Sequence, residues 1–346
     1  MRAPIRRAAA ALAIAAGGAL PLGGCAGPQS AFAPAGPAAA HIATLWWAML
    51  AAATVVCIVV VAATVYALLR RRGAAPPDAA SPAARDERAD ERGTRAILLA
   101  GAVVPALILT ALYVATLVVL RVTAPGAAPA DLVVEVEGRQ YWWAVRYPGR
   151  DGASPVVTAN ELHIPVGRRV EVRLRAADVI HSFWVPRLHG KTDLIPGRVN
   201  VTWLQADSAG VYRGQCAEFC GVQHARMAFT VVALPEARFA AWLAGQRAPA
   251  PAPASPAARE GLAVFLARCA SCHAIRGTPA RGRLGPDLTH LASRRTLAAG
   301  TLSNTRGHLA GWIANPQVIK RGALMPRVPL TPRELRALLA YLEGLR

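Results

Sequence analysis

The residues best suited to chemistry in this chain lie close together in residues 216–227. The segment holds two cysteines, a histidine and a methionine: Cys216, Cys220, His224 and Met227. Thiolate, imidazole and thioether groups are the soft ligands that copper prefers in proteins. Cysteines spaced this closely usually hold a metal or a cofactor rather than forming a disulfide framework. The segment therefore predicts a metal site.

A further histidine, His181, lies upstream at the end of a predicted strand. Two cysteines and two histidines would also satisfy a structural zinc ion. A zinc site would not need Met227, however, and the chain has only four methionines. One is the initiator and Met49 lies in an apolar stretch, whereas Met227 and Met325 both lie at candidate ligand positions. The methionine therefore favours copper.

Residues 269–273 form a second constellation, Cys-Ala-Ser-Cys-His. This pattern is typical of c-type haem attachment, in which Cys269 and Cys272 form thioethers and His273 binds the iron. A thiol redox pair is the alternative use of two such cysteines. Met325 lies 52 residues after His273 and is a candidate distal ligand.

His/Met ligation raises the reduction potential of a haem iron into the range of cytochrome c. The competing distal candidates are His290 and His308.

The N-terminal residues are typical of a bacterial signal peptide. Arg2, Arg6 and Arg7 precede an apolar run that ends in Leu-Gly-Gly-Cys25, which is similar to a lipobox. We therefore expect residues 1–25 to be a leader of the lipoprotein type, with Cys25 lipidated. An uncleaved leader with an incidental cysteine is the alternative.

Two longer apolar stretches predict a transmembrane hairpin over residues 40–122. Residues 42–69 and 96–120 contain no charged residue, and each exceeds the roughly 20 residues that a helix needs to cross the hydrocarbon core. The intervening loop is rich in arginine, so the positive-inside rule places it in the cytoplasm. The chain after residue 121 then lies on the periplasmic face of the bacterial inner membrane.

From about residue 131 the apolar pattern changes to the period of two that is typical of half-buried strands. Val170, Val172 and Leu174 alternate with charged residues. Short apolar runs bounded by turn residues also predict strands, at 132–136, 201–204 and 228–234. We expect an all-β sandwich or barrel over residues 126–246.

Residues 247–257 are rich in proline and alanine and predict a semi-rigid linker. The remaining residues, 258–346, predict a compact helical domain. Its last helix has Thr331 as N-cap and Glu334 three residues later, which together form a capping box.

His181 and the cluster in residues 216–227 resemble the dinuclear copper (CuA) domain of cytochrome c oxidase subunit II, which has a cupredoxin-like fold. The resemblance implies six copper ligands: the bridging thiolates of Cys216 and Cys220, the imidazoles of His181 and His224, the thioether of Met227 and the carbonyl of Glu218. It also implies that the Glu218 carboxylate binds Mg²⁺ at the interface with subunit I, since oxygen ligands suit that ion.

Residues 191–198 resemble the family's contact with the haem-bearing subunit, which implies that Asp193 and Arg198 lie near haem propionates. Residues 140–143, Gln-Tyr-Trp-Trp, resemble the aromatic patch through which electrons enter. Tyr141 and Trp142 are therefore candidates for electron entry.

For Trp143 we favour core packing.

Two positions depart from the family. Tyr141 stands where a tryptophan often lies, and Leu98 stands where many members carry a glutamate at the mouth of a proton path. The route of electrons and the proton path stay open at this point.

Residues 258–346 resemble an all-α class I cytochrome c. Gly261 and Phe265 precede the attachment motif at helical spacing, and Gly285 begins a Gly-Pro pair similar to the loop beside the proximal histidine. The resemblance implies covalently attached haem c and favours Met325 as distal ligand, because it has the family's position and following proline.

The order of hairpin, copper domain and cytochrome domain resembles subunit II of a caa-type haem–copper oxidase. The resemblance implies electron transfer from cytochrome c or the bc complex through haem c and CuA to subunit I. There oxygen is reduced to water with proton translocation, so subunit I and the other oxidase subunits are the implied partners. The alternative is a membrane-tethered CuA and haem c carrier that serves a non-oxidase reductase.

The excess of positive charge lies mainly on the C-terminal segment. Residues 126–246 carry 13 basic and 11 acidic residues, whereas residues 255–346 carry 14 basic and 4 acidic ones. The excess on the second segment favours an acidic partner or an anionic lipid surface. No basic run is interleaved with aromatic residues, so no nucleic acid partner is expected.

Overall fold

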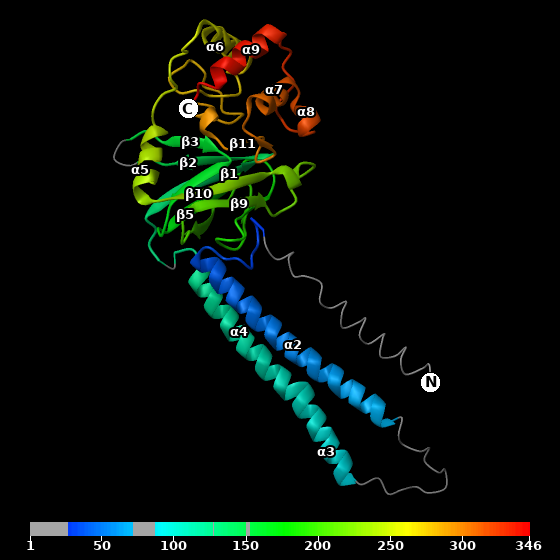
Figure 1. Ribbon diagram of the computed structural model, residues 1–346. Helices are drawn as coiled ribbons and strands as arrows, with labels where there is room; N and C mark the ends of the chain where they lie inside the picture. The colour runs from blue at the N-terminus through cyan, green and yellow to red at the C-terminus, as the bar shows by residue number, and fades with distance from the viewer. Residues whose placement is uncertain (1–26, 72–86, 127, 150–152) are drawn as a thin grey trace, which may run out of the picture. The chain divides into compact units, whose positions relative to one another are not determined.

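The computed structural model describes residues 27–71, 87–126, 128–149 and 153–346 (Figure 1). The expected leader over 1–25, including Cys25, lies outside the described residues. The chain divides into a helical unit, residues 40–129, and a larger unit that holds residues 1–39 and 130–346.

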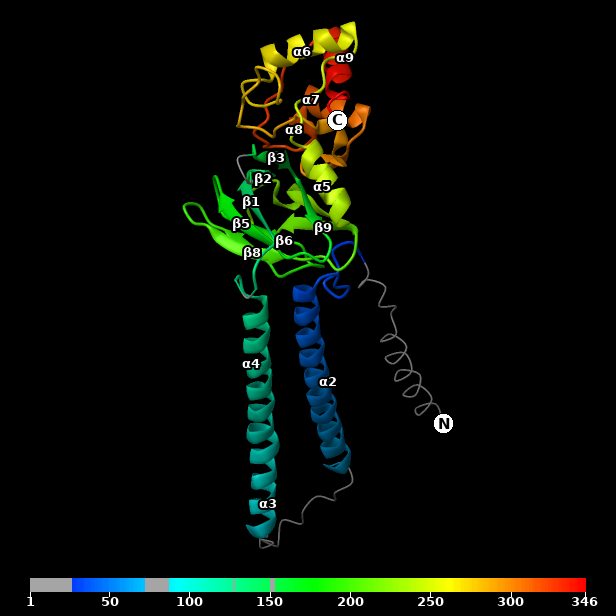
Figure 2. The ribbon, with the colours of Figure 1, turned by 90° about the vertical axis from the view of Figure 1, so that its left-hand side faces the viewer.

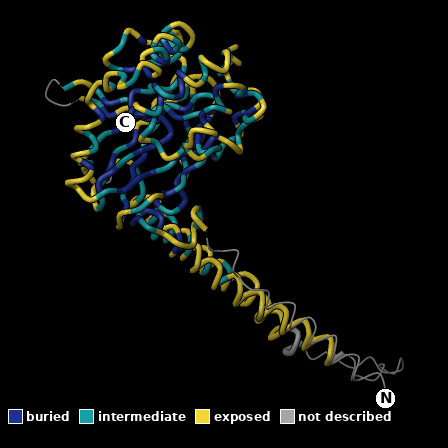
Figure 3. Tube along the Cα trace, turned by 45° about the horizontal axis from the view of Figure 1, so that its top comes forward, coloured by how far each residue is buried: buried dark blue, intermediate teal, exposed yellow. Residues whose placement is uncertain are grey.

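The helical unit consists of two long helical runs, each apolar over most of its length. α2 (Pro37–Arg71) is one, and the other joins α3 (Glu87–Leu98), the π-helical turn η2 (Leu99–Val103) and α4 (Val104–Thr123). Large apolar side chains along both are exposed, and Pro37–Leu69 and Glu91–Thr123 are each long and apolar enough to cross a membrane. The predicted pair of apolar helices is confirmed (Figure 3).

The middle of the chain folds into two five-stranded sheets (Figure 2). The first has the order β3 (Val156–Ala159), β2 (Trp142–Tyr147), β1 (Leu132–Arg139), β5 (Val170–Ala176) and β8 (Asn200–Leu204). The second has the order β4 (Glu161–Pro165), β10 (Ala228–Leu234), β9 (Gly210–Cys216), β6 (His181–Trp184) and β7 (Thr192–Leu194).

Alternating side chains hold the two sheets together. Val170, Val172 and Leu174 of β5 are fully buried, while the charged residues between them point away from the core. Trp143 is 1% exposed and packs edge-on against Phe183, as its expected packing role requires. The predicted β-sandwich is confirmed, and parallel pairs (β1 with β5, β4 with β10) occur beside the antiparallel ones.

α5 (Glu236–Gly245) follows β10 and covers the edge near β4, where Trp242 stacks on His163 with ring centroids 3.9 Å apart. Residues 249–254 carry no regular secondary structure.

The C-terminal domain is helical, with α6 (Pro256–Arg268), α7 (Arg306–Ala314), α8 (Pro316–Ile319) and α9 (Pro332–Leu342). A two-stranded hairpin, β11 (Thr296–Leu297) and β12 (Leu302–Ser303), precedes α7. The Thr331 hydroxyl accepts from the Glu334 amide and the Glu334 carboxylate accepts in return, so the predicted capping box is confirmed.

α6 and α9 approach closely because residue 261 is glycine: a Cβ there would lie 2.0 Å from the Ala337 carbonyl oxygen. Phe265 and Tyr341 fill the core beside this crossing.

Candidate metal centre and haem pocket

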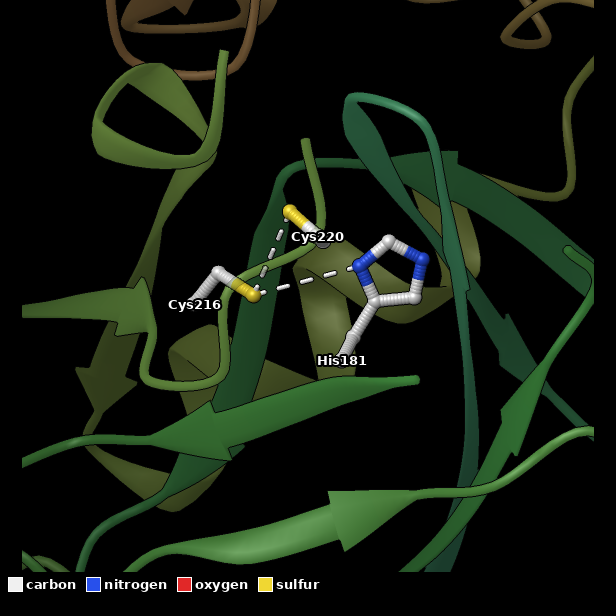
Figure 4. A group of neighbouring side chains, drawn as sticks. All are labelled: His181, Cys216 and Cys220. Carbon is white, nitrogen blue, oxygen red and sulfur yellow. Dashed lines mark hydrogen bonds between the residues drawn. The ribbon is translucent and has the colours of Figure 1, made fainter. Parts of the chain in front are cut away.

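Three side chains from different elements converge inside the sandwich (Figure 4). The Nδ1 or Nε2 of His181 and the Sγ atoms of Cys216 and Cys220 lie within 4.8 Å of one another. β6 begins with His181 and β9 ends with Cys216, and the antiparallel pairing of these strands places Phe183 opposite Cys216. The β-ladder therefore brings a distant histidine to the cysteine pair. All three side chains are buried.

The loop after β9 brings the other predicted ligands to the same place. The Nδ1 of His224, in the short helix η3 (His224–Arg226), lies 3.7 Å from the Cys220 Sγ. The Met227 Sδ is also 3.7 Å from that sulfur, and the Glu218 carbonyl oxygen is 3.3 Å from the Cys216 Sγ. The structure thus gathers all six residues that the sequence proposed as copper ligands.

The electrostatics of the two cysteines favour a cation. Their sulfurs are 3.8 Å apart, and the hydrogen bond between the two sulfurs lowers the pKa of Cys216. The same contact raises the pKa of Cys220, because a second thiolate beside the first is disfavoured. Metal binding requires deprotonated thiols, and a soft cation between them removes this conflict. The donor set therefore fits a copper centre.

Two further residues position the ligands, and sequence reasoning did not identify either. Asp178 Oδ1 lies 2.7 Å from the Nε2 of His181, which leaves Nδ1 facing the sulfurs. A carboxylate in this place fixes the orientation of a ligating imidazole. Gln140 donates from its backbone amide to Asp178 Oδ2 and from its side chain to the Cys220 carbonyl, each over 2.6 Å.

The spacing of Asp178 three residues before a ligand histidine is a weak signal. Gln140 gives no such signal in the sequence, because its partner Cys220 lies 80 residues away.

A cavity of about 470 Å³, lined mostly by residues of the helical domain, carries the second constellation. Cys272, His273 and Met325 all line it. The Nδ1 of His273 lies 2.8 Å from the Pro286 carbonyl oxygen, which leaves Nε2 free to bind a metal. A Cβ at Gly285 would lie 2.5 Å from His273 Cε1, so this residue must be glycine for the ring to take its position.

The attachment cysteines lie on a single turn, because the amides of Cys272 and His273 both donate to the Cys269 carbonyl. Burial raises the pKa of Cys269 to about 11, which does not suit a reactive redox thiol. The chemistry of the donor set and the apolar lining therefore fit a haem.

The competing distal ligands lie elsewhere. Among the described residues that line the cavity, neither His290 nor His308 occurs. The Nδ1 of His290 is 2.9 Å from the Arg346 carbonyl oxygen, and that of His308 is 2.9 Å from the Ser303 carbonyl oxygen. The cavity geometry favours Met325.

Residues of the copper domain also line the haem cavity. Tyr141, Trp142 and Asp178 contribute to its wall, and Tyr141 is only 7% exposed. The aromatic patch identified in the sequence therefore lies between the two candidate redox sites. Arg198 is exposed, and Asp193 and Glu218 are half-buried at the surface of the copper domain.

Comparison with known proteins agrees with this organisation. The family described as "Cytochrome C oxidase subunit II, periplasmic domain" matches residues 150–234, and the cytochrome c family matches residues 258–346. These matches imply copper in the sandwich and haem in the helical domain. The fold and sites thus define a copper protein with two apolar helices and a C-terminal cytochrome domain.

Named relatives extend over most of the chain. The cytochrome c oxidase subunit 2 of Alkalihalophilus pseudofirmus is 36% identical over 261 residues, covering 73% of this chain and 74% of that one. The protein of the same name from Bacillus sp. (strain PS3) is 36% identical over 227 residues, covering 62% of each chain. The chain belongs to the cytochrome c oxidase subunit II family, with a cytochrome c domain fused at its C-terminus.

A solved periplasmic domain of subunit II of cytochrome oxidase from Bradyrhizobium japonicum is 32% identical. It covers 35% of this chain and 96% of that chain, with a TM-score of 0.33.

Proposed function

We propose that this chain passes electrons from cytochrome c or the bc complex through haem c and a CuA centre to subunit I of a respiratory oxidase. Subunit I then reduces oxygen to water with proton translocation. The observation that carries the proposal is that His181, His224, Met227 and the Glu218 carbonyl converge on the sulfurs of Cys216 and Cys220. This cluster lies beside a cavity that is lined by part of a c-type haem motif.

Copper in the proposed centre would be held by the Cys216 and Cys220 thiolates together with His181, His224, Met227 and the Glu218 carbonyl. When bound, the copper pair supplies a one-electron centre. The protein contributes rigidity, since β6, β9 and η3 hold the donors and Asp178 fixes the His181 ring. A preorganised site needs little rearrangement when its charge changes.

In the proposed haem site, Cys269 and Cys272 would form the thioethers while His273 and Met325 would hold the iron. The Pro286 carbonyl orients His273, and Gln317 donates from its side-chain amide to the Met325 carbonyl over 2.9 Å. The apolar walls exclude water, and burial of this kind tunes the reduction potential.

The surface residues supply the proposed contacts with the oxidase. Glu218 binds Mg²⁺ at the interface with subunit I, and Asp193 and Arg198 approach the haem propionates of that subunit. The copper domain (126–246) and cytochrome domain (258–346) lie on the periplasmic face of the bacterial inner membrane. In this chain Leu98 stands where many family members carry the glutamate of a proton path, so that position offers no carboxylate here.

Gentle detergent purification tests the assignment. We expect the chain to co-purify with a second haem-bearing subunit and to support oxygen uptake with reduced cytochrome c as donor. Recovery of the chain with haem c and copper but no haem-bearing partner would contradict the oxidase and favour a carrier for another reductase.

Met325→Ala tests the distal ligand. We expect the haem c potential to fall, because a thioether ligand raises it, while the near-infrared copper band stays unchanged. Redox titration followed optically measures both. An unchanged haem potential would refute Met325, and His308→Ala is the matched control, since His308 is outside the cavity wall.

A further inference from the structure

Three consecutive residues of the cytochrome domain contact the copper domain. Arg226 donates to the Ile319 carbonyl, Lys320 Nζ donates to the Tyr141 carbonyl over 2.7 Å, and Gln223 donates to the Arg321 carbonyl over 2.8 Å. Gln223 and Arg226 belong to the loop that carries the copper ligands. Residues 319–321 end four residues before Met325, so one short segment touches the copper loop and leads to the haem ligand.

Lys320 is the buried centre of this contact. Its side chain is 2% exposed, and its Nζ also donates to the Ala298 carbonyl over 3.0 Å. Ala298 precedes Ala299, whose carbonyl accepts from the Ala228 amide of β10 over 3.1 Å. Lys320 therefore joins two segments of the cytochrome domain to the copper domain at one atom.

The residue type is informative, because only two of the 39 basic residues are lysines, Lys191 and Lys320. Burial lowers the pKa of Lys320 to about 7, so the amine loses its charge at modest cost. A guanidinium stays charged and presents a wide planar fork, whereas a compact amine can serve two carbonyls inside a small space. Lysine is thus the basic side chain that suits this position.

The backbone that Lys320 holds is the same segment that supports the copper ligands. Tyr141 follows Gln140, which donates to the Cys220 carbonyl and to the Asp178 carboxylate. Lys320 and Tyr141 also both line the haem cavity. A displacement of Lys320 would therefore alter the contact between the cavity wall and the copper site.

We propose that Lys320 is a positioning residue that fixes the haem-bearing domain on the copper domain in one geometry and thereby sets the rate of electron transfer between them. The proposal rests on the proposed function. The step moves one electron: the haem iron is oxidised from ferrous to ferric and the copper pair gains that electron, with no bond made or broken.

Lys320→Met tests this role in the purified full chain loaded with haem c and copper. The change keeps the length of the side chain and removes its donors. We expect haem-to-copper electron transfer after photoreduction of the haem to slow by about tenfold or more, since small misplacements of reacting groups are costly. The haem c spectrum and the near-infrared copper band should stay unchanged.

Arg321→Met is the matched control, because it removes one charge at the next position from an exposed side chain whose carbonyl alone makes the contact. We expect it to transfer electrons at the rate of the unaltered chain. An equal rate in Lys320→Met and Arg321→Met, with both spectra intact, would overturn the proposal.

Amine labelling tests the docking without any substitution and remains informative if Lys320→Met fails to fold. In the native chain, an amine-reactive ester should modify Lys320 at least about tenfold more slowly than in the denatured chain, because labelling needs local opening. Lys191 is exposed and should react readily in both states. Equal labelling of Lys320 in native and denatured chains would refute the docked geometry.

The outcomes separate this proposal from the function on which it rests. A chain without a copper band or covalent haem would contradict the proposed function itself. A chain with both centres but with rapid labelling of Lys320 would contradict only the docking.

Discussion

The two candidate redox sites differ in how much of each the polypeptide builds by itself. The candidate copper ligands are already in contact, with Cys220 Sγ within 3.8 Å of three other donor atoms. Four of the six, His181, Cys216, Cys220 and Met227, are buried in the sandwich core. The candidate haem residues Cys272, His273 and Met325 instead line an open space of about 470 Å³. The comparison teaches that the copper domain positions its cofactor, whereas the cytochrome domain needs its cofactor to complete its core.

The largest expected effect follows from removing the proposed covalent attachment of haem. In Cys269→Ala/Cys272→Ala, the haem would no longer be tethered and the apolar wall of its cavity would face water, so we expect the cytochrome domain to lose most of its stability. We expect hydrogen exchange to show an unfolded cytochrome domain and a protected copper domain. Equal protection of both domains would contradict the claim that only the cytochrome domain needs its cofactor to fold.

A smaller effect is expected at the helix crossing in the cytochrome domain. Gly261→Ala places a Cβ against the Ala337 backbone and should lower the free energy of unfolding by about 3 kcal/mol. Thermal unfolding followed at the haem absorbance measures it. Gly307→Ala in α7 is the control, since a Cβ there meets nothing within 4 Å, and a similar loss in both variants would contradict the close-packing argument.

The copper domain should show a pH dependence that involves His163. Burial and then the charge of Arg295 lower the pKa of this histidine to about 4, while in the unfolded chain it stays near its ordinary value of about 6.5. The unfolded state therefore binds more protons between these values, so stability falls as pH drops from about 6.5 to 4. The expected loss is about 2 kcal/mol for this half-buried group.

His163→Phe keeps a ring against Trp242 and removes the titration. Comparing denaturant unfolding of the two chains by tryptophan fluorescence at pH 7 and pH 4.5 isolates the contribution. A loss of stability that is the same in both chains would show that His163 is not its source.

The smallest effect on stability is expected at the copper site itself. Met227→Leu conserves volume in a fully buried position and should change the free energy of unfolding of the sandwich by less than about 1.5 kcal/mol. The near-infrared band should nevertheless shift, because a thioether ligand is lost. Unfolding of the sandwich in this variant would mean that copper completes its core after all.

The sequence predicted the elements whose signals are local. The alternation of Val170, Val172 and Leu174, the two apolar helices and the Thr331 capping box all appear in the structure. The candidate ligands could also be found, because five of the six lie within residues 216–227. That segment combines two cysteines, a histidine and a methionine, which is an unusual set of soft side chains.

The partners that orient those ligands could not be predicted in the same way. Gln140 meets Cys220, and Lys320 meets Tyr141, only because strands and domains distant in sequence come together. Neither contact corresponds to a recognisable spacing of residues in the sequence. The π-helical turn before α4 also has no simple pattern, although Pro105 in the first turn of α4 removes a backbone donor there.

The central claim is that one chain carries a copper pair and a covalently attached haem. The most direct test is the metal and haem content of the purified full chain, measured with its optical and near-infrared spectra. The account predicts two copper ions for each haem, a near-infrared copper band, and haem that remains attached after denaturation. Zinc in place of copper, or haem released on denaturation, would contradict it.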